Sequence, residues 1–128
     1  MSTLAGAPLL WELARLEPAI ERAWRQSTSA EPDLWSPENP ARGQCAVTAL
    51  VVQDYCGGQL LRGVVDGESH YWNVLEDGRE LDLTLRQFEQ PARVADVQRR
   101  ERDYVLSFPD TCARYKQLRS SVDEQLGL

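Results

Sequence analysis

The sequence has one histidine, one lysine and only three cysteines among its 128 residues. The cysteines are Cys45, Cys56 and Cys112, and no two of them form a Cys-x-x-Cys pair. Because His70 is the only imidazole, the usual zinc ligand sets cannot be assembled from these residues. An odd number of irregularly spaced cysteines predicts free thiols in a reducing compartment rather than a disulfide framework.

Long apolar runs and clustered cations are also missing. No stretch approaches the roughly 20 apolar residues that a membrane-spanning helix needs, and the first residues show no basic segment followed by an apolar run, the mark of a secretory signal. The formal net charge is −6, whereas binding to a phosphate backbone needs clustered positive charge. We therefore expect a cytoplasmic protein whose partners include neither a membrane nor a nucleic acid.

What is present suffices for one folded domain over residues 1–128. Hydrophobic residues make up 42% of the chain and charged residues 27%, as is typical of globular proteins. A chain of this length buries a core without disulfides or a structural metal. The composition does not distinguish a monomer from a homodimer, and both stay open.

Amphipathic patterns predict a helix near each end of the chain. In residues 8–24, leucine, isoleucine and tryptophan recur at three- and four-residue spacing, as in a helix with one buried face. Pro18 interrupts this pattern, so the helix either kinks there or gives way to a second helix. We expect Asp110 to cap the last helix. The apolar face of that last helix consists of Cys112, Tyr115, Leu118, Val122 and Leu126.

Residues 27–43 contain three prolines and no periodicity, which predicts a long loop. Loops of this length inside a compact domain are often functional. Because this one leads directly into Cys45, it either lines a site or is a solvated connector. We expect Trp35 to anchor it.

The most apolar stretch, residues 44–55, predicts a buried helix that begins at Cys45. Its apolar residues cover nearly every helical face, as expected for a helix surrounded by other elements. Valine and threonine also suit a buried strand. The length of about twelve residues and the stop signal at Gly57 and Gly58 favour the helix.

The chain that follows carries the alternation and turn signals of strands. The expected strands are residues 59–66, 70–75 and 79–83, with a fourth around Val94 and Val97. Asp66-Gly67 marks a turn, a short turn or helix runs through Gln87, and residues 104–108 fit an edge strand or a loop. The fold class is α+β, with a central helix packed on an antiparallel sheet and flanked by N- and C-terminal helices.

Cys45, His70 and Asp82 arrive on successive elements with the chemistry of a thiol-dependent active site. A cysteine acts as a nucleophile only as a thiolate, which a helix N-terminus favours through its unpaired N–H groups and dipole. Gly43 suits the tight turn into such a helix. A histidine then takes the proton, and a third polar group orients the imidazole. The other two cysteines lack these features, and we expect them to be structural.

The position of Asp82 relative to His70 depends on the hairpin turn between them. Side chains alternate along a strand, so His70 and Trp72 share one face while Asn73 lies on the other. The three-residue loop Glu76-Asp77-Gly78 pairs Trp72 with Asp82 and places the carboxylate diagonally beside His70. A two-residue Asp-Gly loop pairs Asn73 with Asp82 and turns the carboxylate to the opposite face.

Two segments resemble the YunG family of small bacterial proteins. They are NPARGQCAVTALVVQDYCGG, which contains Cys45, and HYWNVLEDGRELDLTLRQF, which starts at His70. The resemblance extends from Trp24 to about Tyr115. More distantly, a cysteine at a helix start followed by His-x-Trp and Asp-Leu-Thr is similar to the transglutaminase-like core, which has a proline in place of Leu83.

The resemblance implies a papain-like fold with Cys45, His70 and Asp82 as the catalytic triad. Papain-like enzymes also use a glutamine before the nucleophile to help hold the oxyanion, and Gln44 and Asn39 are the candidates for that role. The chain is short for a protease, which favours a small amide, a side-chain amide or an acyl-transfer substrate.

The sequence therefore predicts a cysteine amidohydrolase or acyltransferase that forms a thioester intermediate and needs no metal or organic cofactor. We expect Trp35 and Trp72 to wall its cleft. Two other classes stay open. In a non-catalytic binding module, Cys45 is buried away from His70 or has an unperturbed thiol. In a purely structural subunit, His70 packs in the core without a carboxylate partner.

Overall fold

The computed structural model describes residues 10–88 and 93–128 of the chain. Its helices are α1 (Leu10–Ala23), α2 (Cys45–Cys56), α3 (Arg102–Leu106) and α4 (Pro109–Gln125), with 3₁₀ turns η1 (Gln26–Thr28) and η2 (Leu85–Gln87). Its strands are β1 (Gln59–Val65), β2 (Glu68–Val74), β3 (Glu80–Leu81) and β4 (Ala95–Arg100). No helix among the described residues has the length and hydropathy needed to cross a membrane.

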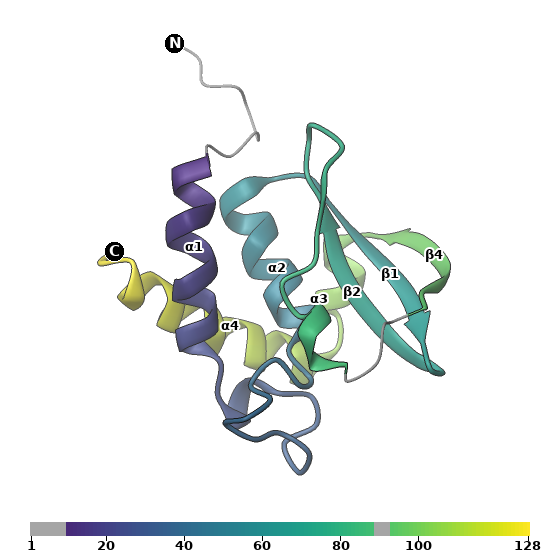
Figure 1. Ribbon diagram of the computed structural model, residues 1–128, viewed down its shortest axis with the longest axis horizontal. Helices are drawn as coiled ribbons and strands as arrows, with labels where there is room; N and C mark the ends of the chain where they lie inside the picture. The colour runs from purple at the N-terminus through teal and green to yellow at the C-terminus, as the bar shows by residue number, and fades with distance from the viewer. Residues whose placement is uncertain (1–9, 89–92) are drawn as a thin grey trace.

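Helix α2 lies at the centre of the molecule, with the sheet on one side and α1 and α4 on the other (Figure 1). One apolar cluster fills the space between α1, α2 and α4 and includes Ile20, Val51 and Leu118. A second cluster, which includes Leu50 and Leu60, lies between α2, β1 and α3. This arrangement confirms the expected α+β fold, in which a central cysteine-bearing helix packs on an antiparallel sheet.

Burial on nearly all sides makes the central segment a helix. Its buried residues are Val47, Thr48, Ala49, Leu50, Val51, Val52 and Cys56. The helix begins at Cys45 and ends at Cys56, and Gly57 follows with a φ of 71°, a conformation that stops a helix. The competing strand is therefore wrong, because tertiary packing outweighs the weak helix propensity of valine and threonine.

Helix α1 is continuous and contains Pro18 in its interior, so no second helix begins there. Pro18 cannot donate a backbone hydrogen bond, and the burial of Leu16, Ile20 and Trp24 offsets that loss. The indole N–H of Trp24 donates to Thr48 Oγ1 at 2.9 Å. This buried bond fixes the chain just beyond α1 to the N-terminal part of α2.

Within the described residues the sheet has the order β3-β2-β1-β4, and all neighbouring strands are antiparallel. Asp66 and Gly67 form the two-residue turn between β1 and β2, both with positive φ, as the Asp-Gly pair predicts. Strand β4 confirms the expected fourth strand and pairs with β1. Strand β3 is shorter than expected, because only Glu80 and Leu81 pair with β2.

The turn between β2 and β3 is the three-residue loop Glu76-Asp77-Gly78. The N–H of Leu75 donates to the carbonyl of Arg79 at 2.7 Å and closes the loop. The glycine has a φ of 89°, the left-handed conformation that this loop type requires. Beyond the turn, Glu80 pairs with Val74 and Leu81 pairs with Asn73, which is the register that a three-residue loop sets. The two-residue alternative is therefore wrong, and Asp82 lies on the face that carries His70.

Of residues 104–108, for which the sequence favours an edge strand or a loop, the first three belong to the short helix α3 and only the last two lie in a turn. Val105 is buried in the cluster beneath α2. Arg102 donates to the carbonyl of Leu50 at 3.3 Å and to Gln53 Oε1 at 3.0 Å. These contacts with α2 outweigh the local strand propensity.

Helix α4 begins two residues earlier than a cap at Asp110 would place it. Pro109 is its first residue, a position that tolerates the missing N–H, and Asp110 is its second. Asp110 is therefore not the cap; its carboxylate binds Arg114 one turn later at 2.8 Å. Leu118 and Val122 are buried, as the predicted apolar face requires.

A polar cluster fastens the C-terminal half of α2 to α3 and α4. The carboxylate of Asp54 accepts from Arg102 at 2.7 Å and from Arg119 at 2.8 Å. The hydroxyl of Tyr115 donates to the same carboxylate at 2.5 Å. Because one half-buried carboxylate satisfies three donors from two helices, the cluster restricts the position of α2.

The loop that precedes α2 is held along its length. Trp35 anchors it as expected, because its indole N–H donates to the carbonyl of Pro40 at 2.9 Å. Gly43 has a φ of 74°, and its carbonyl accepts from the N–H of Ala30 at 2.8 Å. A Cβ at this position would lie 2.3 Å from Ser29 Oγ. Both the backbone conformation and this close approach therefore require glycine.

Gly43→Ala is expected to lower the free energy of unfolding by roughly 3 kcal/mol or more, because a steric clash adds to the strain of a left-handed φ. Gly78→Ala is the matched control. Its φ is 89°, but the added carbon meets nothing in the described chain within 4 Å, so we expect a loss of about 1–2 kcal/mol. Urea unfolding measures both variants. Equal losses would contradict the steric explanation.

Candidate active site

Cys45 is the first residue of α2, and it is half-buried. The first N–H groups of a helix have no partner inside the helix and point beyond its N-terminus. Together with the helix dipole, they favour a negative charge on the thiol and on an oxygen bound beside it. The predicted start of the helix at Cys45 is confirmed.

His70 lies in β2 and is buried, with 1% of its side chain exposed. Its Nε2 lies 2.6 Å from Asp82 Oδ2, across the three-residue turn. A charge-assisted hydrogen bond of this length is strong. The structure therefore brings together two of the residues that the sequence singles out.

Thr84 holds the carboxylate of Asp82 from the other side. Asp82 Oδ1 accepts from the backbone N–H of Thr84 at 3.2 Å and from its hydroxyl at 3.4 Å. This local turn competes with strand pairing, which explains why β3 ends at Leu81. Because both oxygens are engaged, the orientation of the carboxylate toward His70 is fixed.

Two aromatic rings enclose the imidazole of His70. The ring of Trp72 stacks on it with centroids 5.7 Å apart, and Phe88 meets it edge-on at 5.1 Å. The indole N–H of Trp72 donates to Glu80 Oε1 at 2.7 Å. Trp72 is itself only 6% exposed, so it covers the imidazole and does not wall an open cleft as expected.

The second ring nitrogen of His70, Nδ1, is buried and has no partner with full hydrogen-bond geometry among the described residues. Cys45 is nevertheless close enough to act on the ring through a hydrogen-bond and charge interaction. Because Asp82 occupies Nε2, Nδ1 is the nitrogen left for the thiol. Catalytic contacts are often long in ligand-free enzymes and shorten when substrate binds.

Opposing effects set the pKa of His70. Burial lowers it, but the hydrogen bond with Asp82, the nearby thiol of Cys45 and the charges of both groups raise it from 6.5 to about 9. At neutral pH the imidazole is therefore protonated.

Gln44 lies next to the thiol in sequence, but its hydrogen bonds run elsewhere. Its side chain is fully buried, with Nε2 donating to the carbonyl of Arg25 at 2.9 Å and Oε1 accepting from Thr28 Oγ1 at 2.8 Å. The side chain thus fastens the start of α2 to η1. Its role in holding an oxyanion stays a prediction, and the first N–H groups of α2 are further candidate donors for that role.

Gln87 holds the side chain of Asn39. The side chain of Asn39 donates to the carbonyl of Gln87 at 3.0 Å. Gln87 is buried; its Oε1 accepts from the N–H of Gly43 at 3.2 Å and its Nε2 donates to the carbonyl of Thr84 at 3.1 Å. Gln87 therefore ties the turn that holds Asp82 to the loop that leads into α2.

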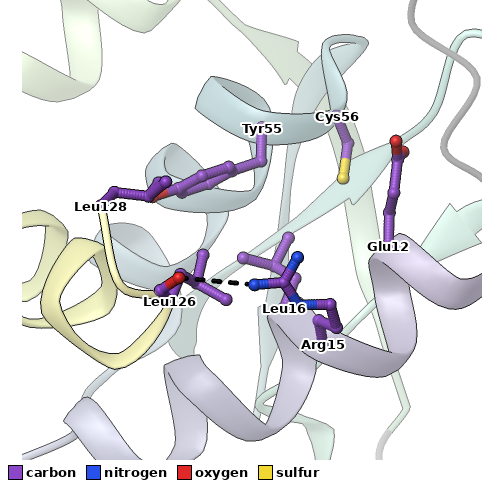
Figure 2. A pocket seen from close by; sticks show the side chains of 7 residues that line it. All are labelled: Glu12, Arg15, Leu16, Tyr55, Cys56, Leu126 and Leu128. Carbon is purple, nitrogen blue, oxygen red and sulfur yellow. Dashed lines mark hydrogen bonds between the residues drawn. The ribbon is translucent and has the colours of Figure 1, made fainter.

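A separate pocket of about 230 Å³ lies at the other end of α2, beside Cys56. Figure 2 shows Tyr55 and Cys56 on its wall and Arg15 reaching across to the carbonyl of Leu126, at 3.4 Å. Burial and the charge of Glu12 raise the pKa of Cys56 to about 11, against a smaller lowering by a nearby arginine. Cys56 is therefore a poor nucleophile at neutral pH, and this pocket is not where thiol chemistry is expected.

The raised pKa of His70 can be read directly, because it is the only histidine and its imidazole signals need no further assignment. In a proton NMR titration we expect a midpoint near 9. Asp82→Asn and Cys45→Ala each lower the midpoint, because each removes a negative partner, and Cys112→Ala leaves it unchanged. A wild-type midpoint at or below about 6.5 would contradict the assembled site.

The same pKa makes stability depend on pH. Because the pKa of His70 is higher in the folded chain than in the unfolded one, protonation stabilises the fold. This contribution is full below about pH 6.5 and is lost as the pH rises through about 9. Asp82→Asn is expected to cost on the order of 2 kcal/mol at pH 6 and clearly less at pH 10, measured by urea unfolding. Equal losses at both pH values would refute this coupling.

Comparisons with known proteins agree with the resemblance. A protein named "Uncharacterized protein YunG", from Bacillus subtilis (strain 168), is 38% identical over 72 residues, which span 56% of this chain and 59% of the relative. The match thus covers less than two thirds of the relative's length. No solved structure matches the chain. The family model described as "YunG protein" matches residues 12–127, and the chain therefore belongs to the YunG family.

Proposed function

We propose that this protein is a cysteine-dependent amidohydrolase or acyltransferase. Cys45 is the nucleophile, His70 carries the proton and Asp82 orients His70. The observation that carries the proposal is the 2.6 Å contact between His70 and Asp82, with the Cys45 thiol left to the other nitrogen of the same imidazole. A nucleophile, a base and an orienting group in this order form the machinery of covalent acyl transfer.

The reaction starts from the thiolate of Cys45 and the imidazolium of His70. Sγ attacks the carbonyl carbon of an amide, and the carbonyl oxygen takes the electron pair. His70 gives its Nδ1 proton to the leaving nitrogen as the C–N bond breaks, which leaves a thioester on Cys45. Water or an amine then attacks the thioester, His70 takes up its proton, the C–S bond breaks and the thiolate returns.

The N-terminus of α2 stabilises the oxyanion formed in each step. The free N–H groups of the first turn are fixed in direction by the helix and point toward the reacting carbonyl oxygen. The Asp54 cluster and the buried apolar faces hold α2 in place, so these donors need no reorganisation during the reaction.

We also propose that the architecture is papain-like, of the transglutaminase-core kind. Support comes from the element order: a cysteine starts the central helix, and histidine and aspartate follow on a hairpin. The contacts within the two short motifs add to this. In His-x-Trp, Trp72 stacks on His70, and in Asp-x-Thr, Thr84 holds Asp82. Each motif thus contains a triad residue and the residue that positions it.

Two other classes were compatible with the sequence. A purely structural subunit loses support, because the buried His70 has a carboxylate partner. A non-catalytic binding module is favoured by one observation, the lack of full hydrogen-bond geometry at His70 Nδ1. Against it, Cys45 is half-buried and interacts with the imidazole. The three cysteines of the described chain are free, as a thiol enzyme of the cytoplasm requires.

Trapping of the acyl intermediate tests the proposal. With p-nitrophenyl acetate, an activated acyl donor, we expect a burst of nitrophenolate and one acetyl group on Cys45, located by peptide mass spectrometry. Cys45→Ser removes the burst, and His70→Gln slows acetylation by roughly a hundredfold or more. Cys112→Ser is the control and leaves the burst unchanged. Acetylation shared equally between Cys45 and Cys112, or insensitive to His70→Gln, would favour the binding module.

A further inference from the structure

The sheet face that packs on α2 continues past the N-terminus of the helix. Asn73 Nδ2 donates to the carbonyl of Ala49 at 2.9 Å, which places the middle of α2 over Asn73. Nearer the N-terminus of α2, Ala46 packs against the same apolar cluster as Tyr71. Arg62 is paired with Tyr71 across β1 and β2 and shares its face. Arg62 therefore lies on the part of the sheet just beyond the start of α2.

Arg100 joins Arg62 on this surface. Gln98 of β4 pairs with Arg62, and Arg100, two residues further along β4, shares the face of Gln98. Arg62 donates twice to Ser69 Oγ, at 2.9 and 2.5 Å. Arg100 donates to Gln98 Oε1 at 2.7 Å and lies over the ring of Tyr104, 5.7 Å from its centroid. Neutral groups thus hold both side chains in place.

Neither Arg62 nor Arg100 forms an ion pair with any described residue, whereas several other arginines do. The paired arginines include Arg42, Arg102, Arg114 and Arg119. A guanidinium has five N–H donors, and Arg62 and Arg100 each use two of them in the described chain. In a chain of net charge −6, this surface therefore presents unneutralised positive charge and unused donors.

Tyr71 connects this surface to the thiol. Burial raises the pKa of Tyr71, and the charge of Cys45 raises it further. The charges of Arg62 and Arg100 act in the opposite direction on the same phenol. The thiol and the two guanidinium groups therefore lie within electrostatic reach of a single side chain.

We propose that the substrate attacked by Cys45 carries a carboxylate, which Arg62 and Arg100 bind on the sheet surface beyond α2. The inference rests on the proposed function of Cys45. Guanidinium groups bind carboxylates through parallel N–H donors. Binding there positions a neighbouring carbonyl at the thiol. Amides that carry a free carboxylate are therefore substrates, and their neutral analogues react more slowly.

A matched pair of alkylating reagents tests this preference without knowledge of the substrate. N-(iodoacetyl)glycine carries a carboxylate, and N-(iodoacetyl)glycinamide is its neutral counterpart. In both, Sγ of Cys45 bonds to the methylene carbon and iodide leaves. We expect the anionic reagent to alkylate Cys45 faster in the wild type. In the double variant R62Q/R100Q, the ratio of the rate with the anionic reagent to the rate with the neutral reagent falls by at least about tenfold. The rate with the neutral reagent itself stays unchanged.

Arg99→Gln is the control for net charge, because Arg99 neighbours Arg100 in β4 and, by alternation, lies on the opposite face. It is expected to leave the rate ratio unchanged. A wild type without preference, or an equal effect of Arg99→Gln, would overturn the carboxylate inference. The proposed function survives that outcome if the neutral reagent still labels Cys45 in a His70-dependent manner.

A binding measurement decides the inference even if Cys45 is unreactive. N-Acetylglycine titrated into the wild-type protein is expected to shift the backbone N–H signals of Arg62, Tyr71 and Arg100 in NMR spectra. N-Acetylglycinamide, which lacks the carboxylate, shifts them far less. Shifts of equal size with the two compounds, or none with N-acetylglycine, would refute an anion site on this surface.

Discussion

The hydrogen bond between His70 and Asp82 is the interaction on which the site depends, and it depends in turn on the length of one loop. The two side chains meet because the turn between β2 and β3 contains three residues. A turn one residue shorter would move every following side chain to the opposite face of the hairpin. With the bond in place, one imidazole nitrogen is fixed and the other is left for the thiol of Cys45. The helices and the Asp54 cluster act at a distance, by holding α2 against the sheet that carries the pair.

The electrostatics of the His70–Asp82 pair follow from the burial of His70 and from the groups around it. Burial disfavours a charged imidazole, so His70 would be neutral in this position without its neighbours. The carboxylate of Asp82, held by Thr84, and the thiol of Cys45 reverse that effect and favour a protonated ring. Trp72 and Phe88 keep water from the ring, which strengthens both interactions. Removing one partner leaves the others buried without compensation, so the site is expected to work as a unit.

The sequence predicts the parts of this arrangement that local chemistry determines. The apolar run and its glycine stop define α2, and Gly78 makes the three-residue loop one of two possible turns. The choice between those turns needed the structure, because it is made by pairing across the sheet. The sequence did not reveal α3, whose residues have strand propensity and become helical through contacts with α2. It also did not mark Phe88 or Gln87, since a glutamine in a short turn has no signature until its tertiary partners are known.

The central claim is that Cys45 and His70 form a thiolate–imidazolium pair, and the pH dependence of alkylation tests it most directly. The rate of iodoacetamide labelling is measured separately at each cysteine, in the wild type and in His70→Ala. A free thiol is half ionised near pH 8.5. The pair predicts that Cys45 is labelled well below that pH, far faster than Cys56 and Cys112, and that His70→Ala removes this advantage. Labelling of Cys45 no faster than the other cysteines, with the pH profile of a free thiol, would contradict the account.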